Sequence, residues 1–234
     1  MAELASGNKF APQTDQVNIE SFGTDEIRGF LHHPSAADGS GLVLTHGAGS
    51  NCEAPLLMGL AAVFAKAGSL VLRMDLPFRR KRPKGPPLPG DAALDRAGLL
   101  QASTLLRKMA GGALWLAGHS YGGRQATMLV ADEPKAADAL LLLSYPLHPP
   151  ARPDQARTAH WPTLRTPLFF VHGTKDPFGS IDELQSSLPL IPAPTALATL
   201  PGAGHDLRRG KFALEDLVVR PFRDFAAATG RSKK

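Results

Sequence analysis

The sequence predicts an α/β protein built on one mainly parallel, twisted sheet that is flanked by helices. Short apolar runs alternate along the chain with longer segments of helical periodicity. Several of these runs are continuous Leu, Val or Phe stretches, such as ALLLL at 139–143, which is typical of strands buried on both faces of a sheet. The first two runs are separated only by a short turn, so we expect a hairpin that adds antiparallel strands at one edge.

The expected elements can be placed in chain order. The hairpin strands are Val17–Phe22 and Glu26–His33, with a turn-forming GTD segment between them. Glycines at 68 and 111–112 stand where helices should end, as left-handed caps do. Pro221 interrupts the last helical region and marks either a kink or the start of a separate helix. The remaining predicted strands are 41–47, 69–76, 113–118, 138–147, 166–173 and 195–202, and the predicted helices are 54–68, 90–109, 121–132, 180–188 and a last region that ends at Thr229.

Length and composition favour a single globular domain. The chain has 234 residues, of which 43% are hydrophobic and 20% are charged, and no Ser/Gly-rich linker divides it. We therefore expect one domain over 15–229, a disordered N-terminal tail at 1–14 and a basic C-terminal tail at 230–234. Cys52 is the only cysteine, which excludes an intramolecular disulfide. There is no apolar run long enough for a secretory signal or a membrane span, so we expect a cytoplasmic protein that does not bind membranes.

The net charge of +5 is concentrated in residues 76–90, LPFRRKRPKGPPLPG, which we call the basic segment. Its prolines predict an irregular loop. Without its cations, the rest of the chain has 21 basic and 21 acidic residues, so we expect no nucleic-acid surface. The segment contains five prolines, no acid and the five cations Arg79, Arg80, Lys81, Arg82 and Lys84.

The stretch GHSYGG at 118–123 carries the clearest chemical signal. It follows a predicted strand and leads into a predicted helix, which is the setting of a nucleophile elbow with the pattern G-x-S-x-G. Such a turn is so sharp that there is no room for a side chain at positions 118 and 122, which are therefore Gly118 and Gly122. The same turn exposes Ser120 above the sheet. The alternative is a glycine-rich turn with an incidental serine.

A serine nucleophile needs a histidine base and a carboxylate that orients the base. In this type of fold they follow the serine in the order acid, then base, each at the end of a later strand. Asp176 follows the strand that ends at 173, and His205 follows the strand at 195–202. Asp206 is the second candidate for the orienting acid, although neighbouring side chains seldom face each other.

The fourth component is a pair of backbone N–H donors for the oxyanion. Tyr121, directly after the serine, should supply one donor. The other should come from the loop HGAGSN at 46–51, with Ala48 as the first choice and Gly49 as the second. This glycine-containing loop lacks the Gly-Lys-Ser/Thr and the G-x-G-x-x-G that phosphate-binding loops require.

With these motifs the chain resembles the α/β-hydrolases from about Val17 to Thr229. It is most similar to small, uncapped, dienelactone-hydrolase-like members through THGAGS, AGHSYGG, VHGTKDPFG and GAGHDL. Those dienelactone hydrolases use cysteine as the nucleophile, whereas this chain has Ser120. The resemblance implies hydrolysis without a metal or an organic cofactor, and it identifies no substrate.

Other residues admit weaker hypotheses. His32 and His33 are adjacent on a strand and point to opposite faces, and no metal-binding spacing occurs, so we expect no metal site. The stretch 148–165 is too short and proline-rich for a cap domain and should line an open active site. Within it, His148, His160 and Trp161 are candidate substrate contacts, and solvated loop residues are the alternative.

The leading hypothesis is a serine hydrolase that cleaves carboxylic esters or related acyl compounds. Thioesters and peptides remain open as substrates, and so does the oligomeric state. The competing hypothesis is an interaction protein with a vestigial triad that binds a partner through the basic segment. In the enzyme, Arg79, Arg80 and Arg82 would lie at the active-site rim and attract an anionic acyl substrate, or they would only keep the loop soluble.

Overall fold

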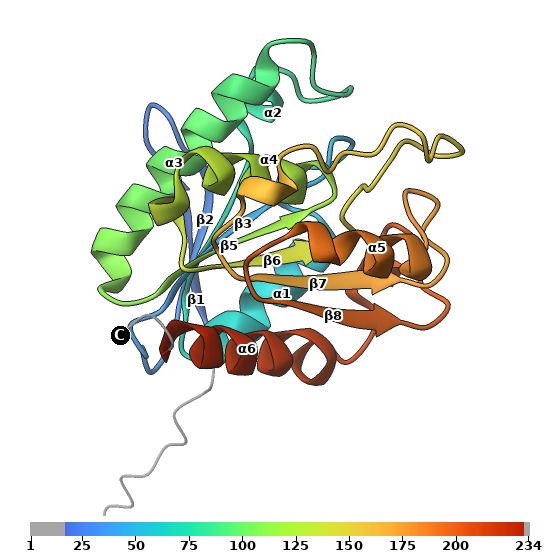
Figure 1. Cartoon of the computed structure of the whole chain (residues 1–234). Coiled ribbons are helices and arrows are strands. Elements are labelled where there is room, and N and C mark those ends of the chain that lie inside the picture. The colour runs from blue at the N-terminus through green and yellow to red at the C-terminus, as the bar shows by residue number, and fades with distance from the viewer. Residues whose placement is uncertain (1–16, 232–234) are drawn as a thin grey trace, which may run out of the picture.

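The computed structural model of the chain describes residues 17–231. Its centre is an eight-stranded sheet with the strand order β1-β2-β4-β3-β5-β6-β7-β8 (Figure 1). Strand β2 is antiparallel to both β1 and β4, and all other neighbouring strands are parallel. The predicted parallel sheet with an antiparallel N-terminal hairpin is therefore confirmed. The strands are β1 (Asn18–Gly23), β2 (Arg28–His33), β3 (Gly41–Thr45), β4 (Leu70–Met74), β5 (Leu114–His119), β6 (Ala139–Leu143), β7 (Leu168–Gly173) and β8 (Thr195–Leu200).

Helices cover both faces of this sheet. The buried side chains of α1 and α6 pack on one face, and those of α3, α4 and α5 pack on the other. Gly111 ends α3 in the left-handed conformation at φ 85°, as expected for a helix-terminating glycine. The α-helices are α1 (Pro55–Lys66), α2 (Pro77–Lys81), α3 (Asp91–Ala110), α4 (Tyr121–Asp132), α5 (Ile181–Ser187) and α6 (Arg220–Arg231), and shorter helical turns lie at Pro134–Ala136, Trp161–Thr163, Leu188–Leu190, Leu207–Gly210 and Glu215–Val219.

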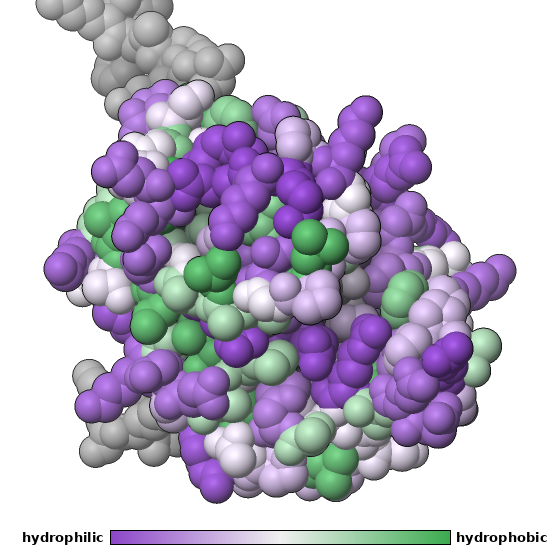
Figure 2. Space-filling view, turned by 90° about the horizontal axis from the view of Figure 1, so that it is seen from above, coloured by the Kyte–Doolittle hydropathy of each residue, from purple (hydrophilic) through white to green (hydrophobic). Residues whose placement is uncertain are grey.

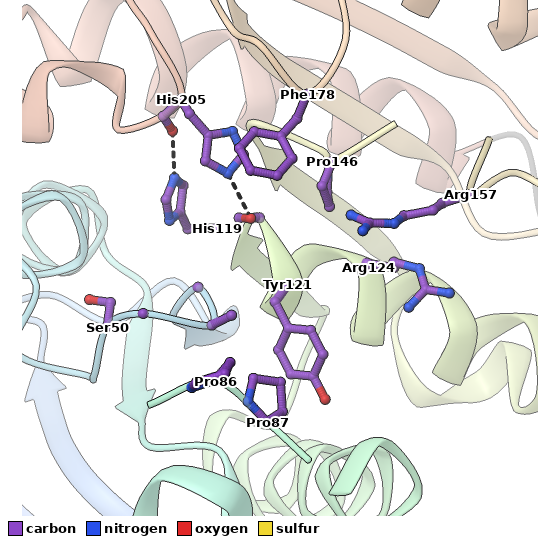
Figure 3. Close-up of a pocket in the computed structure, with 14 residues that line it drawn as sticks. Ser50, Pro86, Pro87, His119, Tyr121, Arg124, Pro146, Arg157, Phe178 and His205 are labelled. Atoms are coloured by element: carbon purple, nitrogen blue, oxygen red, sulfur yellow. Dashed lines mark hydrogen bonds between the residues drawn. The ribbon is translucent and has the colours of Figure 1, made fainter. Parts of the chain in front are cut away.

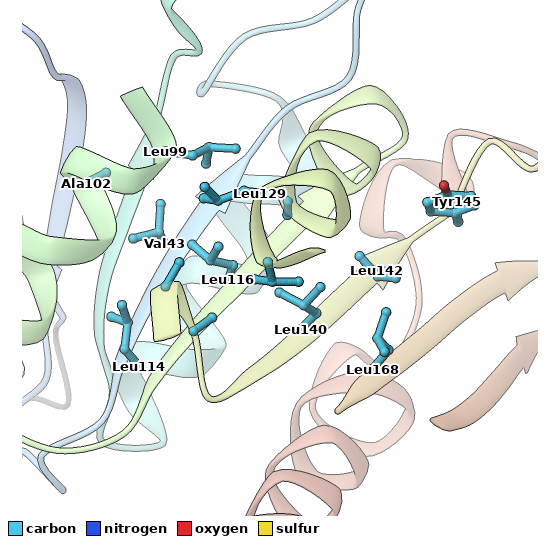
Figure 4. Close-up of a cluster of buried hydrophobic side chains, with 14 of the residues drawn as sticks. Val43, Leu99, Ala102, Leu114, Leu116, Leu129, Leu140, Leu142, Tyr145 and Leu168 are labelled. Atoms are coloured by element: carbon cyan, nitrogen blue, oxygen red, sulfur yellow. The ribbon is translucent and has the colours of Figure 1, made fainter. Parts of the chain in front are cut away.

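Two apolar layers hold the helices to the sheet. Aliphatic side chains from β3, β5 and β6 meet those of α3 and α4 in the first layer (Figure 4). In the second layer, the ring of Phe222 meets Trp115 and Phe64 edge to face, at centroid distances of 5.2 and 5.9 Å. Trp115 is thus a core residue, and burial of such rings is a main source of folding free energy.

The basic segment is only partly irregular, which corrects the prediction of a loop. Its first residues form α2, with Pro77 in the first turn, where the fixed φ of proline suits a helix and its missing N–H costs no hydrogen bond. The irregular part begins at Arg82, which adopts an extended conformation. Phe78 and Arg79 of this helix are buried, so it packs against the body of the protein.

The ends of the chain and the stretch before β7 complete the fold. The predicted N-terminal tail at 1–14 lies outside the described residues. The helical turn Glu215–Val219 runs directly into α6, whose second residue is Pro221. Because α6 continues to Arg231, the first two residues of the predicted C-terminal tail are helical, and 232–234 lie outside the described residues.

Between β6 and β7 the described chain contains only one short helical turn, and no cap domain is inserted there.

The surface seen from above in Figure 2 is mostly hydrophilic, and the apolar residues that it exposes gather mainly in the left half of the view. Among residues 17–231 there is no helix with the length and hydrophobicity needed to span a bilayer.

Candidate active site

Ser120 occupies a strained turn between β5 and α4. Its backbone has φ 51° and ψ −114°, which is unusual for a residue other than glycine. A side chain at Gly118 would collide with the backbone of Gly123, and one at Gly122 would come within 2.5 Å of the Thr45 hydroxyl. The two glycines therefore allow the sharp turn that the motif predicts, and this turn holds the serine at the carboxyl end of the sheet.

The three predicted catalytic side chains form one hydrogen-bonded chain. His205 Nε2 lies 2.8 Å from Ser120 Oγ, and His205 Nδ1 lies 2.8 and 2.9 Å from the two carboxylate oxygens of Asp176. With the Nδ1–H tautomer, the ring donates to the carboxylate and accepts the serine proton. This is the contact geometry required of a nucleophile, a base and an orienting acid.

Asp176 is ionised and protected from water. Asp176 is only 6% exposed, and its carboxylate also accepts a hydrogen bond from the backbone N–H of Phe178 at 2.9 Å. Burial alone would raise the pKa of Asp176, but the hydrogen bond and charge of His205 and the N–H of Phe178 outweigh it and lower the pKa. The second candidate, Asp206, lies on the surface and accepts the N–H of Arg208 instead.

Two neighbours fix the position of His205. The ring of Phe178 stacks on it with a centroid distance of 4.1 Å. His119 donates from Nε2 to the backbone carbonyl of His205 at 2.7 Å (Figure 3). Burial lowers the pKa of His119 to about 4, so its ring is neutral at physiological pH. The sequence gave no sign that His119 would hold the loop that carries His205.

The predicted oxyanion donors lie beside Ser120. Ala48, Gly49 and Tyr121 all line the pocket that contains Ser120. Within residues 17–231, the backbone N–H groups of Ala48 and Tyr121 have no hydrogen-bond acceptor. Tyr121 is the first residue of α4, so its N–H also lies at the positive end of the helix dipole. These two donors can stabilise negative charge on a bound carbonyl oxygen.

The loop that carries Ala48 is tied to the basic segment by Arg79. The Arg79 side chain donates to the carbonyl oxygens of Ser50 at 2.7 Å and Ala48 at 2.8 Å. It also donates to the carbonyls of Gly85 and Arg82, at 3.0 and 3.1 Å. Since the residue is only 3% exposed, Arg79 is a structural cation that orders this loop, which corrects its prediction as a substrate contact.

The other cations predicted to touch the substrate also have protein partners. Arg80 donates to the carbonyl of Asp25 at 2.7 Å, and Arg82 pairs with the carboxylate of Asp91 at 2.6 Å. Neither lines the pocket, to which the basic segment contributes Pro86 and Pro87 instead. The prediction that these arginines form the rim is corrected, because nearer acceptors on the protein hold them.

The three residues proposed from the stretch 148–165 lie away from the pocket as well. His148 bonds to the carbonyl of Pro149 and faces Glu183, and His160 bonds to the hydroxyl of Thr127. Trp161 is fully buried and donates from its indole to the Tyr145 hydroxyl. All three are therefore corrected to structural residues.

The pocket has a volume of about 600 Å³. Sequence reasoning missed several residues of its wall, which come from four separate segments. Among residues 17–231, no cluster of three His, Cys, Asp or Glu side chains has the arrangement of a metal site. The residues missed are Pro86, Pro87, Arg124, Pro146, Arg157 and Phe178 (Figure 3).

Known proteins share both the sequence pattern and the fold. The model of a family described as an alpha/beta hydrolase domain matches residues 38–216. A dienelactone hydrolase from Anabaena variabilis superposes with a TM-score of 0.70 at 24% identity, covering 92% of this chain and 98% of that one. The protein Est1E from Butyrivibrio proteoclasticus, also solved with ferulic acid bound, has a TM-score of 0.66 at 18% identity, covering 90% of this chain and 98% of that one. An alpha-beta serine hydrolase homologue from Coxiella burnetii has a TM-score of 0.62 at 14% identity, covering 95% of this chain and 99% of that one.

Proposed function

Because this chain belongs to the α/β-hydrolase family, we propose that it is a serine hydrolase that cleaves carboxylic esters or related acyl compounds. The observation that carries this proposal is the continuous hydrogen-bonded chain from Ser120 through His205 to Asp176. A serine turned toward the solvent without a base at 2.8 Å would have no means of activation. No metal or organic cofactor is needed for the steps that follow.

In the first half of the reaction, Ser120 Oγ attacks the carbonyl carbon of the ester and His205 Nε2 takes the serine proton. Asp176 holds the Nδ1–H tautomer and stabilises the imidazolium that forms. The N–H groups of Ala48 and Tyr121 donate to the developing oxyanion. The imidazolium then protonates the leaving alcohol, and an acyl-serine ester remains.

In the second half, water adds to the acyl-serine while His205 accepts its proton. The tetrahedral intermediate collapses, the acid departs and Ser120 regains its proton from His205. Each step uses the same base and the same oxyanion donors, so one geometry serves both halves of the reaction.

The test is hydrolysis of 4-nitrophenyl acetate and covalent labelling by a fluorophosphonate. The Ser120→Ala variant should lose at least about a thousandfold in turnover and should not be labelled. Ser35→Ala, which changes an exposed serine outside the pocket, is the matched control and should behave like the wild type. Unchanged hydrolysis in Ser120→Ala would overturn the assignment. A folded wild type without activity or labelling would favour the interaction protein considered from the sequence.

A further inference from the structure

Two arginines stand on one wall of the pocket, and they come from different parts of the chain. Arg124 belongs to the first part of α4, and its backbone N–H donates to the carbonyl of Ser120 at 3.0 Å. Arg157 belongs to the long connection between β6 and β7. Figure 3 shows both side chains across the pocket from Ser50 and His119. The nucleophile is therefore in direct backbone contact with one member of the pair.

The backbone at Arg157 is firmly held, although it lies outside any regular element. Its N–H donates to the carbonyl of Leu147 at 2.7 Å, and its carbonyl accepts the Tyr145 hydroxyl at 2.8 Å. Tyr145 is itself fully buried and packs on Trp161 and Phe170. This aromatic support fixes the origin of the Arg157 side chain and leaves its guanidinium directed into the pocket (Figure 3).

Neither guanidinium has a protein anion as its partner. Within residues 17–231, no carboxylate forms an ion pair with Arg124 or Arg157, and Arg124 Nε is buried without a hydrogen-bond acceptor. Burial and then the nearby charge of Arg124 lower the pKa of Arg157. A buried donor without an acceptor and two neighbouring like charges both cost free energy. An anion bound between the two guanidinium groups would offset both costs.

The rest of the pocket wall supports the same conclusion. Apart from histidines, the only ionisable charged side chains that line it in the described structure are these two arginines, and no Asp, Glu or Lys does so. Most other lining residues are small or apolar, including Gly47, Pro146 and Phe178. A guanidinium presents a fork of N–H donors that matches the oxygens of a carboxylate or a phosphate. The pocket thus combines an apolar volume with one cationic wall.

We propose that Arg124 and Arg157 form a subsite for an anionic group, a carboxylate or a phosphate, on the acyl compound that Ser120 attacks. This inference rests on the proposed function and narrows it to substrates with a negative charge near the scissile carbonyl. The role of attracting an anionic substrate, which the sequence analysis gave to the basic segment, thus belongs to Arg124 and Arg157, two residues outside that segment.

The kinetic test compares two esters of nearly equal shape, 4-nitrophenyl valerate and 4-nitrophenyl hydrogen glutarate, which differ by a terminal methyl or carboxylate. The wild type should have a higher kcat/KM for the glutarate ester. Arg124→Gln and Arg157→Gln should each lower the glutarate-to-valerate ratio by about tenfold or more. Arg157→Lys should retain part of the preference, because it keeps the charge but loses the fork. Arg152→Gln, on the exposed part of the same connection, is the matched control and should leave the ratio unchanged. Equal ratios in the wild type and both glutamine variants would overturn the subsite.

A binding test separates this inference from the proposed reaction. Glutarate and inorganic phosphate are titrated separately into Ser120→Ala protein and into the same protein with Arg157→Gln, followed by NMR. Saturable binding of either anion that weakens about tenfold in the double variant supports the subsite even if the wild type hydrolyses neither ester. The stronger of the two ligands identifies the preferred anion. Failure of both anions to bind, or equal binding to both proteins, would refute it even if Ser120 is shown to be a nucleophile. Thermal unfolding of each variant checks that the fold is intact.

Discussion

Replacement of Arg79 by methionine should weaken both the fold and the proposed catalysis. Methionine keeps a long apolar chain but removes all four hydrogen bonds that Arg79 donates to backbone carbonyls. Two of those carbonyls, at Ala48 and Ser50, belong to the loop that holds one of the two proposed oxyanion donors. The substitution therefore unties the basic segment from that loop.

The magnitude follows from the number and type of these bonds. A hydrogen bond to a charged group contributes about 1.5–3 kcal/mol, but the four are not additive, and removal of a buried charge also removes its desolvation cost. We expect a net loss of about 3 kcal/mol in the free energy of unfolding, or roughly 6–12 °C in Tm for a chain of this size. Since deletion of an oxyanion donor costs about a hundredfold in turnover or more, displacement of that donor should lower kcat by about tenfold to a hundredfold.

The assay is urea unfolding together with ester hydrolysis, and Arg80→Met serves as the matched control. Arg80 is adjacent in sequence and carries the same charge, but it makes a single exposed hydrogen bond to the carbonyl of Asp25. Its replacement should change the free energy of unfolding by less than about 0.5 kcal/mol and leave kcat nearly unchanged. If Arg79→Met were as stable and as active as Arg80→Met, the structural role assigned to Arg79 would be refuted.

Two further predictions concern ionisation. Burial, together with the charge of Asp75, raises the pKa of the Cys52 thiol to about 12. Iodoacetamide at pH 8 should therefore label Cys52 far more slowly in the native protein than in the urea-unfolded protein, as followed by mass spectrometry. Equal labelling rates would contradict this prediction. The pKa of Asp176 is lowered from its ordinary value of 3.8 despite burial, mainly through its hydrogen bond with His205. The ionised carboxylate therefore stabilises the fold fully above pH 3.8, and this stabilisation is lost as the pH falls through the lowered pKa. Asp176→Asn should thus be less stable than the wild type at pH 7, with a smaller difference at pH 3; a difference independent of pH would contradict the assignment.

The sequence predicted best where a local pattern and a chemical need coincide. Short continuous apolar runs bounded by turn residues and alternating with helical segments indicate strands buried on both faces of a sheet. The glycines around Ser120 are required by the close approach of the backbone at Thr45 and Gly123. Asp176 and His205, the proposed acid and base, could be placed together because both follow strands whose carboxyl ends lie at the same sheet edge. These inferences need only the order of elements, and the sequence contains that order.

Side-chain direction in irregular segments could not be predicted, because it depends on partners distant in sequence. Arg79 turns inward because carbonyls of the loop near Ser50, 29 residues earlier, lie within its reach. Trp161 lies in a proline-rich stretch without periodicity, yet it is buried against Tyr145 and Phe170. The sequence left two interpretations open for each residue, a substrate contact or a solvated loop residue, and the tertiary contacts support neither.

The strand order explains why one arginine of the proposed subsite, Arg124, is placed by the turn that carries Ser120, whereas Arg157 is not. The chain leaves β3 for β4 on one side and then returns past β3 to β5 on the other side. The loop after β3 leads to α1 on one face of the sheet and the turn after β5 leads to α4 on the other face, so the two segments separate and leave a crevice. Pairing of Thr45 with Gly118 brings the loop that carries Ala48 next to the turn that carries Ser120. Arg124 follows Ser120 by four residues, about one helical turn, so the elbow that exposes the nucleophile also brings this arginine to the pocket. Arg157 has no such constraint and reaches the pocket only because Leu147 and Tyr145 hold its backbone. The elbow therefore fixes the first charge of the pair, and the connection between β6 and β7 supplies the second.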